Sequence, residues 1–208
     1  LALREELDDR AGIAGLVHQM GNVNFFRGQL DVAFPLYERA LQLNEETQNY
    51  KAAGYSQGQI GLIWQRRGNN KEALENFRLS LSFFEKDNEE KGMAASHHQI
   101  GRILEGHGNQ DEALQHYEKA LEIRERTGDV LGAAITYGQL GMLFYVKEDY
   151  EPALKYSAQA YAIFTRYGSP NADLARNNML RLRQKLPKET FEAILAEYNI
   201  KTEAGSKP

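Results

Sequence analysis

Along this chain, apolar and small residues recur at the spacing of one helix face, and short polar stretches separate the segments in which they do so. Four of these stretches are RGQLD at 27–31, RGNNK at 67–71, HGNQD at 107–111 and KEDYE at 147–151. The first three carry a glycine that can end a helix, and all four carry Asn, Gln or Asp, of which Asn and Asp can cap the next helix. The pattern predicts helices in pairs, joined by tight turns.

The helix pairs repeat at an offset of 40 residues, which brings one motif into line four times: HQMG (18–21), GQIG (58–61), HQIG (98–101) and GQLG (138–141). The second helix of the first three units carries a small, an aromatic and a small residue at helical spacing, as in Ala33, Tyr37 and Ala40. The fourth unit has Ser157 at the aromatic place. Tyr156 stands beside it, but one residue turns a helix by about 100°, so we expect that ring to point elsewhere.

The repeated glycine lies inside the first helix of each unit, at positions 21, 61, 101 and 141. Glycine in a helix interior costs about 1 kcal/mol relative to alanine. Its return at one register therefore indicates a second helix that packs too closely to leave room for a side chain. No GxGxxG or P-loop pattern surrounds these glycines, so we interpret them as structural and not as a phosphate-binding loop.

With Gly21, Ala33, Tyr37 and Ala40 and their equivalents in later units, the chain resembles the tetratricopeptide repeat family over residues 11–170. The usual unit of that family has about 34 residues. The 40-residue spacing is similar to the longer variety found in Pins-type adaptors, kinesin light chains and bacterial peptide-sensing regulators. The resemblance implies an all-α, right-handed superhelical solenoid of helix-turn-helix hairpins with a C-terminal capping helix. It implies protein or peptide binding and no particular site, because packing positions define the family.

We expect four repeats, at 11–50, 51–90, 91–130 and 131–170, followed by capping helices at 171–198 and a flexible tail at 199–208. The segment at 1–10 matches the one at 121–130, which predicts the second-helix remnant of a preceding repeat and a chain that is part of a larger protein. Pro35 removes a backbone donor beyond the first turn of a helix, which predicts a bend near 34–37. In the last predicted helix, Phe191, Ile194, Leu195 and Tyr198 lie on one side.

Composition narrows the classes of protein. The 208 residues include no cysteine, which excludes disulfides and thiolate metal sites and favours a reducing, cytoplasmic location. No apolar run reaches the length of a membrane span, about 18 residues, so no membrane partner is expected. The net charge of -4 and the pI near 5.8 argue against a nucleic-acid partner, because such proteins usually carry a basic excess.

The repeated glutamine lies opposite the packed glycine on each first helix, because two residues turn a helix by about 200°. In stacked hairpins the first helices line the concave surface, so residues on the glutamine's face are candidate peptide-binding residues. The set comprises Gln19, Asn22, Phe26, Tyr55, Gln59, Leu62, Arg66, Gln99, Arg102, Ile135, Gln139, Met142 and Val146. A column of primary amides offers donors and acceptors to an extended backbone. Alternatively each glutamine braces neighbouring first helices, and the residues leave both interpretations open.

The apolar patch of Ile135, Met142 and Val146 has two interpretations as well. It forms a specificity pocket, or the last predicted helix covers it. Arg66 and Arg102 add positive charge to the glutamine face, so we expect a ligand that carries acidic and apolar side chains. Of the Lys, Asn and Arg clamp that binds carboxylates in the resembled family, only Asn22 matches in type, so C-terminal carboxylate recognition is not expected.

No catalytic chemistry is indicated. The adjacent His97 and His98 diverge on a helix, and the other histidines show no H-x-x-x-H spacing, so no metal is expected. No nucleophile with an orienting histidine and acid stands out, and no cofactor loop is present, so neither an enzyme nor a cofactor is expected.

The expected function is a protein or peptide interaction scaffold that binds an extended segment in the concave groove. Two alternatives remain from the sequence. One is a regulatory peptide-sensor module coupled to a fused effector domain. The other is a structural array that self-associates through the exposed half-repeat at 1–10.

Overall fold

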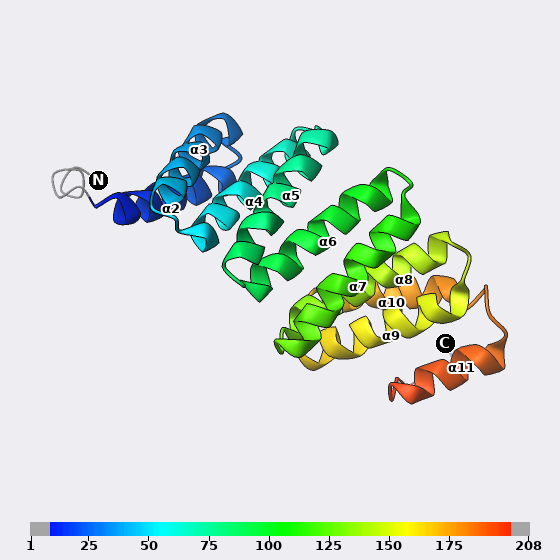
Figure 1. Ribbon diagram of the computed structural model, residues 1–208. Helices are drawn as coiled ribbons and strands as arrows, with labels where there is room; N and C mark the ends of the chain where they lie inside the picture. The colour runs from blue at the N-terminus through cyan, green and yellow to red at the C-terminus, as the bar shows by residue number, and fades with distance from the viewer. Residues whose placement is uncertain (1–8, 201–208) are drawn as a thin grey trace. The chain divides into compact units, whose positions relative to one another are not determined.

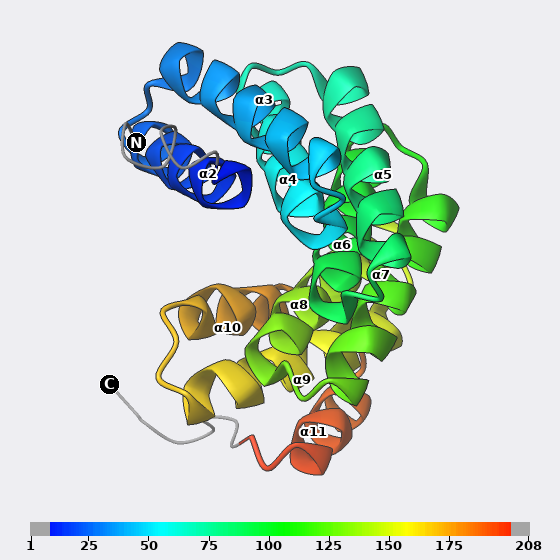
Figure 2. The same cartoon turned by 60° about the vertical axis from the view of Figure 1, so that its left-hand side comes forward.

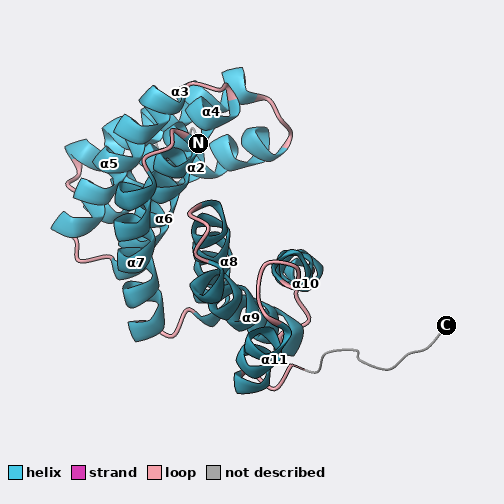
Figure 3. Cartoon of the chain, turned by 90° about the vertical axis from the view of Figure 1, so that its right-hand side faces the viewer, coloured by secondary structure: helices cyan, strands magenta, loops and turns pink. Residues whose placement is uncertain are grey.

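A computed structural model describes residues 9–200, and this part of the chain is a succession of α-helices without a strand (Figures 1 and 3). The helices are α2 (Arg10–Phe26), α3 (Leu30–Glu46), α4 (Tyr50–Arg66), α5 (Asn70–Lys86), α6 (Glu90–Gly106), α7 (Gln110–Arg126), α8 (Val130–Val146), α9 (Tyr150–Arg166), α10 (Asn171–Leu182) and α11 (Lys188–Glu197). The all-α class is confirmed. The remnant helix predicted at 1–10 and the tail predicted at 199–208 lie largely outside the described residues.

The helices α2 to α9 have 17 residues each, and three residues link each one to the next. In every link the middle residue takes a positive φ, which reverses the chain and ends the helix. Glycine holds this place at Gly28, Gly68 and Gly108, with φ between 76° and 80°, as the sequence predicted. Glu148 takes the same conformation with φ 59°, although it has a Cβ.

The predicted caps of the second helices are wrong. The N-cap residues Gln29, Asn69, Asn109 and Asp149 make no side-chain cap hydrogen bond. Side-chain caps occur instead at first helices, where Asp9 accepts from the Gly12 N–H at 2.9 Å and Asp129 from the Gly132 N–H at 3.0 Å. Asn and Asp are present at both kinds of link, so only the local backbone geometry decides which of them caps.

The chain divides into two compact units, Leu1–Ile103 and Leu104–Pro208, with the dividing point inside α6. In the N-terminal unit, α2 packs on α3, α3 on α4, and α4 on α5 (Figure 1). In the C-terminal unit, α9 contacts α8, α10 and α11, and α7 packs on α8 (Figure 2). Consecutive helices are therefore packing partners within each unit, as a series of hairpins requires.

The glycines of the repeat are close-packing positions, as predicted. A Cβ built on Gly21 would lie 2.7 Å from Cε1 of the fully buried Tyr37. A Cβ on Gly61 would lie 3.0 Å from Cε1 of Phe77. The aromatic ring of the second helix thus lies directly on the backbone of the first helix.

The fourth hairpin solves the loss of its aromatic residue in a different way. A Cβ on Gly141 would lie 2.5 Å from Ser157 Oγ and 3.2 Å from the Ala153 carbonyl oxygen, so the serine side chain and the α9 backbone themselves approach α8. The expectation that Tyr156 points elsewhere is wrong. Its ring is half-buried and stacks 5.5 Å from Phe144 and 6.0 Å from Tyr137, both on α8.

Pro35 does not interrupt its helix, since α3 runs from Leu30 to Glu46 with the proline inside it. At the other end, Phe191, Ile194 and Leu195 of α11 are buried, as predicted. They join a core cluster with Ala153, Leu154, Ala158, Met179 and Leu182. The last helix therefore covers α9 and α10, and it leaves Ile135, Met142 and Val146 of α8 between 40% and 58% exposed. The interpretation that α11 covers that patch is wrong.

Candidate functional site

The four repeated glutamines lie on first helices with their amides toward solvent. Gln19 is exposed, and Gln59, Gln99 and Gln139 are half-buried. Gln19 Oε1 accepts a hydrogen bond from Asn22 Nδ2 at 3.3 Å, and Gln99 Oε1 accepts one from Arg102 Nη1 at 3.2 Å, each within one helix. Within residues 9–200 the amides of Gln59 and Gln139 make no hydrogen bond. None of these bonds braces two first helices.

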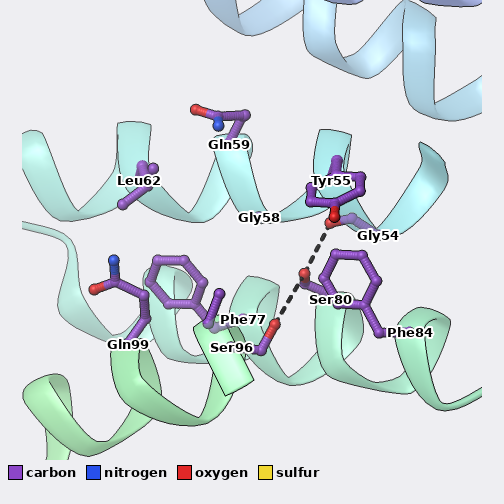
Figure 4. A pocket seen from close by; sticks show the side chains of 11 residues that line it. Gly54, Tyr55, Gly58, Gln59, Leu62, Phe77, Ser80, Phe84, Ser96 and Gln99 are labelled. Atoms are coloured by element: carbon purple, nitrogen blue, oxygen red, sulfur yellow. Dashed lines mark hydrogen bonds between the residues drawn. The ribbon is translucent and has the colours of Figure 1, made fainter. Parts of the chain in front are cut away.

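A pocket of about 120 Å³ lies between α4, α5 and α6 of the N-terminal unit, and we name it the Gly58 pocket (Figure 4). It brings together four of the predicted site residues. Tyr55, Gln59 and Leu62 come from α4, and Gln99 comes from α6. The other lining residues are Gly54, Gly58, Phe77, Ser80, Phe84, Ala95 and Ser96.

The walls of the Gly58 pocket are held by hydrogen bonds and ring contacts. Ser80 Oγ donates to the Gly54 carbonyl at 2.8 Å and lies 3.2 Å from Ser96 Oγ, which ties α5 to α4 and α6 (Figure 4). The Tyr55 ring stands edge-on to Phe84 at 4.9 Å, and its hydroxyl donates to Glu89 Oε1 at 3.3 Å. Burial, together with the negative charge of Glu89, raises the pKa of Tyr55, so this hydroxyl remains a donor at neutral pH.

The C-terminal unit holds a second pocket of about 200 Å³ between α8, α9 and α10, named here the Gly138 pocket. It takes in Ile135, Gln139 and Met142 of the predicted site, together with Gly138, Phe164, Asn171, Leu174, Ala175 and Asn178. A further pocket of about 230 Å³ shares Met142 and Asn178 with it and adds Val146 and Arg181. The predicted apolar patch of α8 is therefore the wall of an open groove against α10.

The remaining predicted residues lie away from these pockets. Asn22 Oδ1 accepts a hydrogen bond from the Tyr37 hydroxyl at 2.8 Å, which uses the side chain within the hairpin. Phe26 is 83% exposed at the end of α2. Arg66 lies with its Cζ 4.0 Å from the Phe25 ring centroid and donates to the Phe25 carbonyl at 3.3 Å, so its charge lies beside α2.

Sequence analysis missed the glycines that open the pockets and the polar residues of α10. Gly58 and Gly138 each precede a repeated glutamine, in the motifs GQIG and GQLG, where the other two motifs have histidine. That alternation was the available signal. Asn178 and Arg181 gave no signal, because α10 departs from the repeat pattern.

Few other groups suggest chemistry. Burial lowers the pKa of His18, whose Nδ1 lies 3.0 Å from Ser56 Oγ. In the part of the chain that the structure describes, no group of three or more His, Asp or Glu side chains is placed to hold a metal ion. No helix among the described residues is long and apolar enough to cross a membrane.

The repeat geometry and the comparison of sequences agree on the family. The family model of the tetratricopeptide repeat matches residues 12–86, 52–126 and 92–166, in overlapping stretches that start 40 residues apart. The chain belongs to the tetratricopeptide repeat family. A search of curated protein sequences finds no significant match.

Solved structures show the same fold at low sequence identity. BtubC (BKLC) from P. vanneervenii superposes with a TM-score of 0.79 at 18% identity, over 95% of this chain and 83% of that one. The apo form of RapI gives a TM-score of 0.79 at 19% identity, over 95% and 73% of the two chains. A Rap protein in complex with competence and sporulation factor gives 0.65 at 17% identity, over 88% and 56%. These likenesses confirm a tetratricopeptide-like helical array.

Proposed function

We propose that this chain is a peptide-binding interaction module, part of a larger protein, that holds an extended segment along the glutamine faces of its first helices. The observation that carries the proposal is the Gly58 pocket, where Gln59 and Gln99 from two different first helices border one hollow. Gln59 has no hydrogen-bond partner among the described residues, so both its donor and its acceptor are open to a ligand backbone.

The charges around the site favour a ligand with acidic residues. No Asp or Glu lines the Gly58 pocket, the Gly138 pocket or the pocket beside it. Arg102 lies one turn from the Gly58 pocket, bonded to Gln99, and Arg181 lines the pocket beside the Gly138 pocket. A guanidinium next to an apolar hollow suits a peptide that alternates apolar and acidic side chains. The Rap protein in complex with competence and sporulation factor lends support by analogy only.

The test is selection of binding peptides from a random displayed library, followed by fluorescence anisotropy with the selected peptides. A Gln59→Ala, Gln99→Ala double variant should bind them at least tenfold more weakly, because two backbone-facing amides are lost. The matched control is Gln42→Ala, Gln115→Ala, which removes two exposed glutamines from the second helices α3 and α7. Failure to select any peptide, or equal affinities of both double variants, would refute the proposal.

A second candidate function, self-association, is favoured by one observation on α2. This helix exposes an apolar face whose equivalents in α4 are buried. The exposed residues are Leu16, Met20 and Val23, at 38%, 41% and 50%, and the buried equivalents are Ser56, Ile60 and Ile63, at 0%, 4% and 0%. Sedimentation equilibrium of the chain and of a Met20→Ser, Val23→Ser variant tests this candidate. It requires a concentration-dependent mass that the variant loses.

A further inference from the structure

The Gly58 pocket and the Gly138 pocket use the same positions of the repeat, 80 residues apart. Each has a glycine followed by a glutamine on its first helix, an apolar residue on either side of that pair, and a phenylalanine below. The corresponding residues are Tyr55 and Ile135, Gly58 and Gly138, Gln59 and Gln139, Leu62 and Met142, Phe84 and Phe164, and Ala95 and Ala175. The two pockets are thus two copies of one construction, one in each unit.

The first and third repeats carry different residue types at these positions. Histidine replaces the glycine, as His18 and His98. At the position of Leu62 and Met142 the side chains are polar, Asn22 and Arg102, and at the position of the phenylalanines they are Asn44 and Arg124. The 40-residue repeat therefore contains an 80-residue repeat, in which every second unit has the residues of a pocket.

The structure shows what histidine does at this position. The half-buried His18 ring lies between α2 and α4, with Nδ1 3.0 Å from Ser56 Oγ and the ring edge-on to Tyr37 at 5.3 Å. Histidine thus occupies the space next to the following first helix. The glycine at 58 leaves the corresponding space between α4 and α6 open as the Gly58 pocket.

Packing does not require glycine at either position. A Cβ built on Gly138 has nothing within 4 Å, and a Cβ on Gly58 meets only Ser80, with Oγ at 3.2 Å. Glycine inside a helix nevertheless lowers stability relative to alanine. Both glycines therefore cost stability without a close-packed partner, in contrast to Gly21 and Gly61, and the open pocket is what they provide.

The size and lining of the pockets define the group that fits. Their volumes are about 120 and 200 Å³. An apolar cavity of about 150 Å³ holds a benzene molecule, so each pocket can hold one aliphatic or aromatic side chain. The walls are apolar, with Leu62 and Phe84 in one pocket and Met142 and Phe164 in the other, and the only amide that both pockets share by position is the repeated glutamine.

We propose that the Gly58 and Gly138 pockets are two equivalent subsites, each of which takes one apolar side chain of a peptide while Gln59 or Gln139 hydrogen-bonds to the backbone beside it. An acidic residue of the peptide follows the anchor, because no acidic residue lines either pocket and Arg102 and Arg181 lie close by. The proposal rests on the peptide-binding function proposed above, and adds the side-chain class and the number of subsites.

The test uses the dipeptide N-acetyl-leucyl-aspartate amide as the probe and the full chain labelled with ¹³C at its Leu, Ile and Met methyl groups. Titration followed by NMR should give saturable shifts of the Leu62 methyls and of the Met142 methyl, which report one pocket each. N-acetyl-glycyl-aspartate amide, which keeps the charge and lacks the apolar side chain, should bind at least tenfold more weakly.

Two variants close the pockets separately. Gly58→His introduces the residue that the repeat carries at position 18, and Ser96 stands where Ser56 stands for His18. It should weaken the Leu62 response at least tenfold and leave the Met142 response unchanged. Gly138→His should do the reverse, so each variant serves as the folding control for the other pocket.

Shifts at only one pocket, equal binding of the glycyl probe, or a Leu62 response that survives Gly58→His would each overturn the proposal. The peptides selected from the displayed library distinguish this failure from failure of the broader function. If those peptides bind with Gln59-dependent affinity while the dipeptide finds neither pocket, the interaction module stands and the two-subsite proposal falls.

Discussion

Two glycines of the same helix should respond in opposite directions to the same substitution. In α2, a Cβ on Gly21 would lie 2.7 Å from Cε1 and 2.9 Å from Cδ1 of Tyr37, whereas a Cβ on Gly15 has nothing within 4 Å. Both residues lie inside α2. Gly15→Ala therefore gains only helix propensity, about 1 kcal/mol.

Gly21→Ala gains the same propensity but overpacks the hairpin. The Tyr37 ring is fully buried, and its hydroxyl is fixed by the 2.8 Å hydrogen bond to Asn22, so the ring has no free space to move into. Overpacking a core costs about 1–3 kcal/mol, which exceeds the propensity gain. We expect Gly21→Ala to lower the free energy of unfolding by about 1 kcal/mol and Gly15→Ala to raise it by about the same amount.

Urea denaturation measures both effects. The fluorescence of Trp64, the only tryptophan, reports the N-terminal unit, in which both glycines lie. Circular dichroism reports both units, so the two probes reveal whether the array unfolds in one step or in parts. Shifts of the urea midpoint in the same direction for both variants would refute the reasoning, because the contact with Tyr37 would then be of no consequence.

Three further predictions concern single positions. Gly138→Ala should stabilise the C-terminal unit by about 0.5–1 kcal/mol, because a Cβ meets nothing there, and a lower thermal midpoint by circular dichroism would contradict the assigned open space. Glu148→Gly should raise the urea midpoint by an amount equivalent to about 0.5–1 kcal/mol, since φ 59° strains a residue with a Cβ, and an unchanged midpoint would show that the turn carries no strain. Burial lowers the pKa of His18 below its ordinary value of 6.5, so the unfolded chain takes up this proton first as the pH falls, and stability should drop below pH 6.5. His18→Gln should reduce that loss in denaturation measured between pH 7 and pH 5, and an identical pH profile would exclude His18 as its source.

The sequence by itself predicted the repeat, its helices and the packing role of its glycines. It could do so because a hairpin array builds each contact from residues close in the chain, so that Gly21 and Tyr37, or Gly61 and Phe77, recur at a constant offset. Helix ends followed from glycines that take positive φ, a local property of the backbone. The family also followed, since packing positions define it.

The expectations that failed depended on geometry between helices. Tyr156 was expected to point away, but Ser157 lets α9 approach α8, and that approach brings the ring onto Phe144. Asn69 and Asp149 have the right chemistry for caps, yet only Asp9, Asn49 and Asp129 accept the cap hydrogen bonds.

The candidate site divides in the same way. The sequence placed thirteen residues on one helical face, because the face of a side chain follows from the helix period alone. Only the tertiary structure decided that Tyr55, Gln59, Leu62 and Gln99 border one pocket, and that Asn22 is used by Tyr37. It also separated Gly58 and Gly138, which open space, from Gly21, which fills none because a ring lies on it. A glycine looks the same in every helix of the sequence, and what lies within 4 Å of its missing side chain belongs to the neighbouring helices.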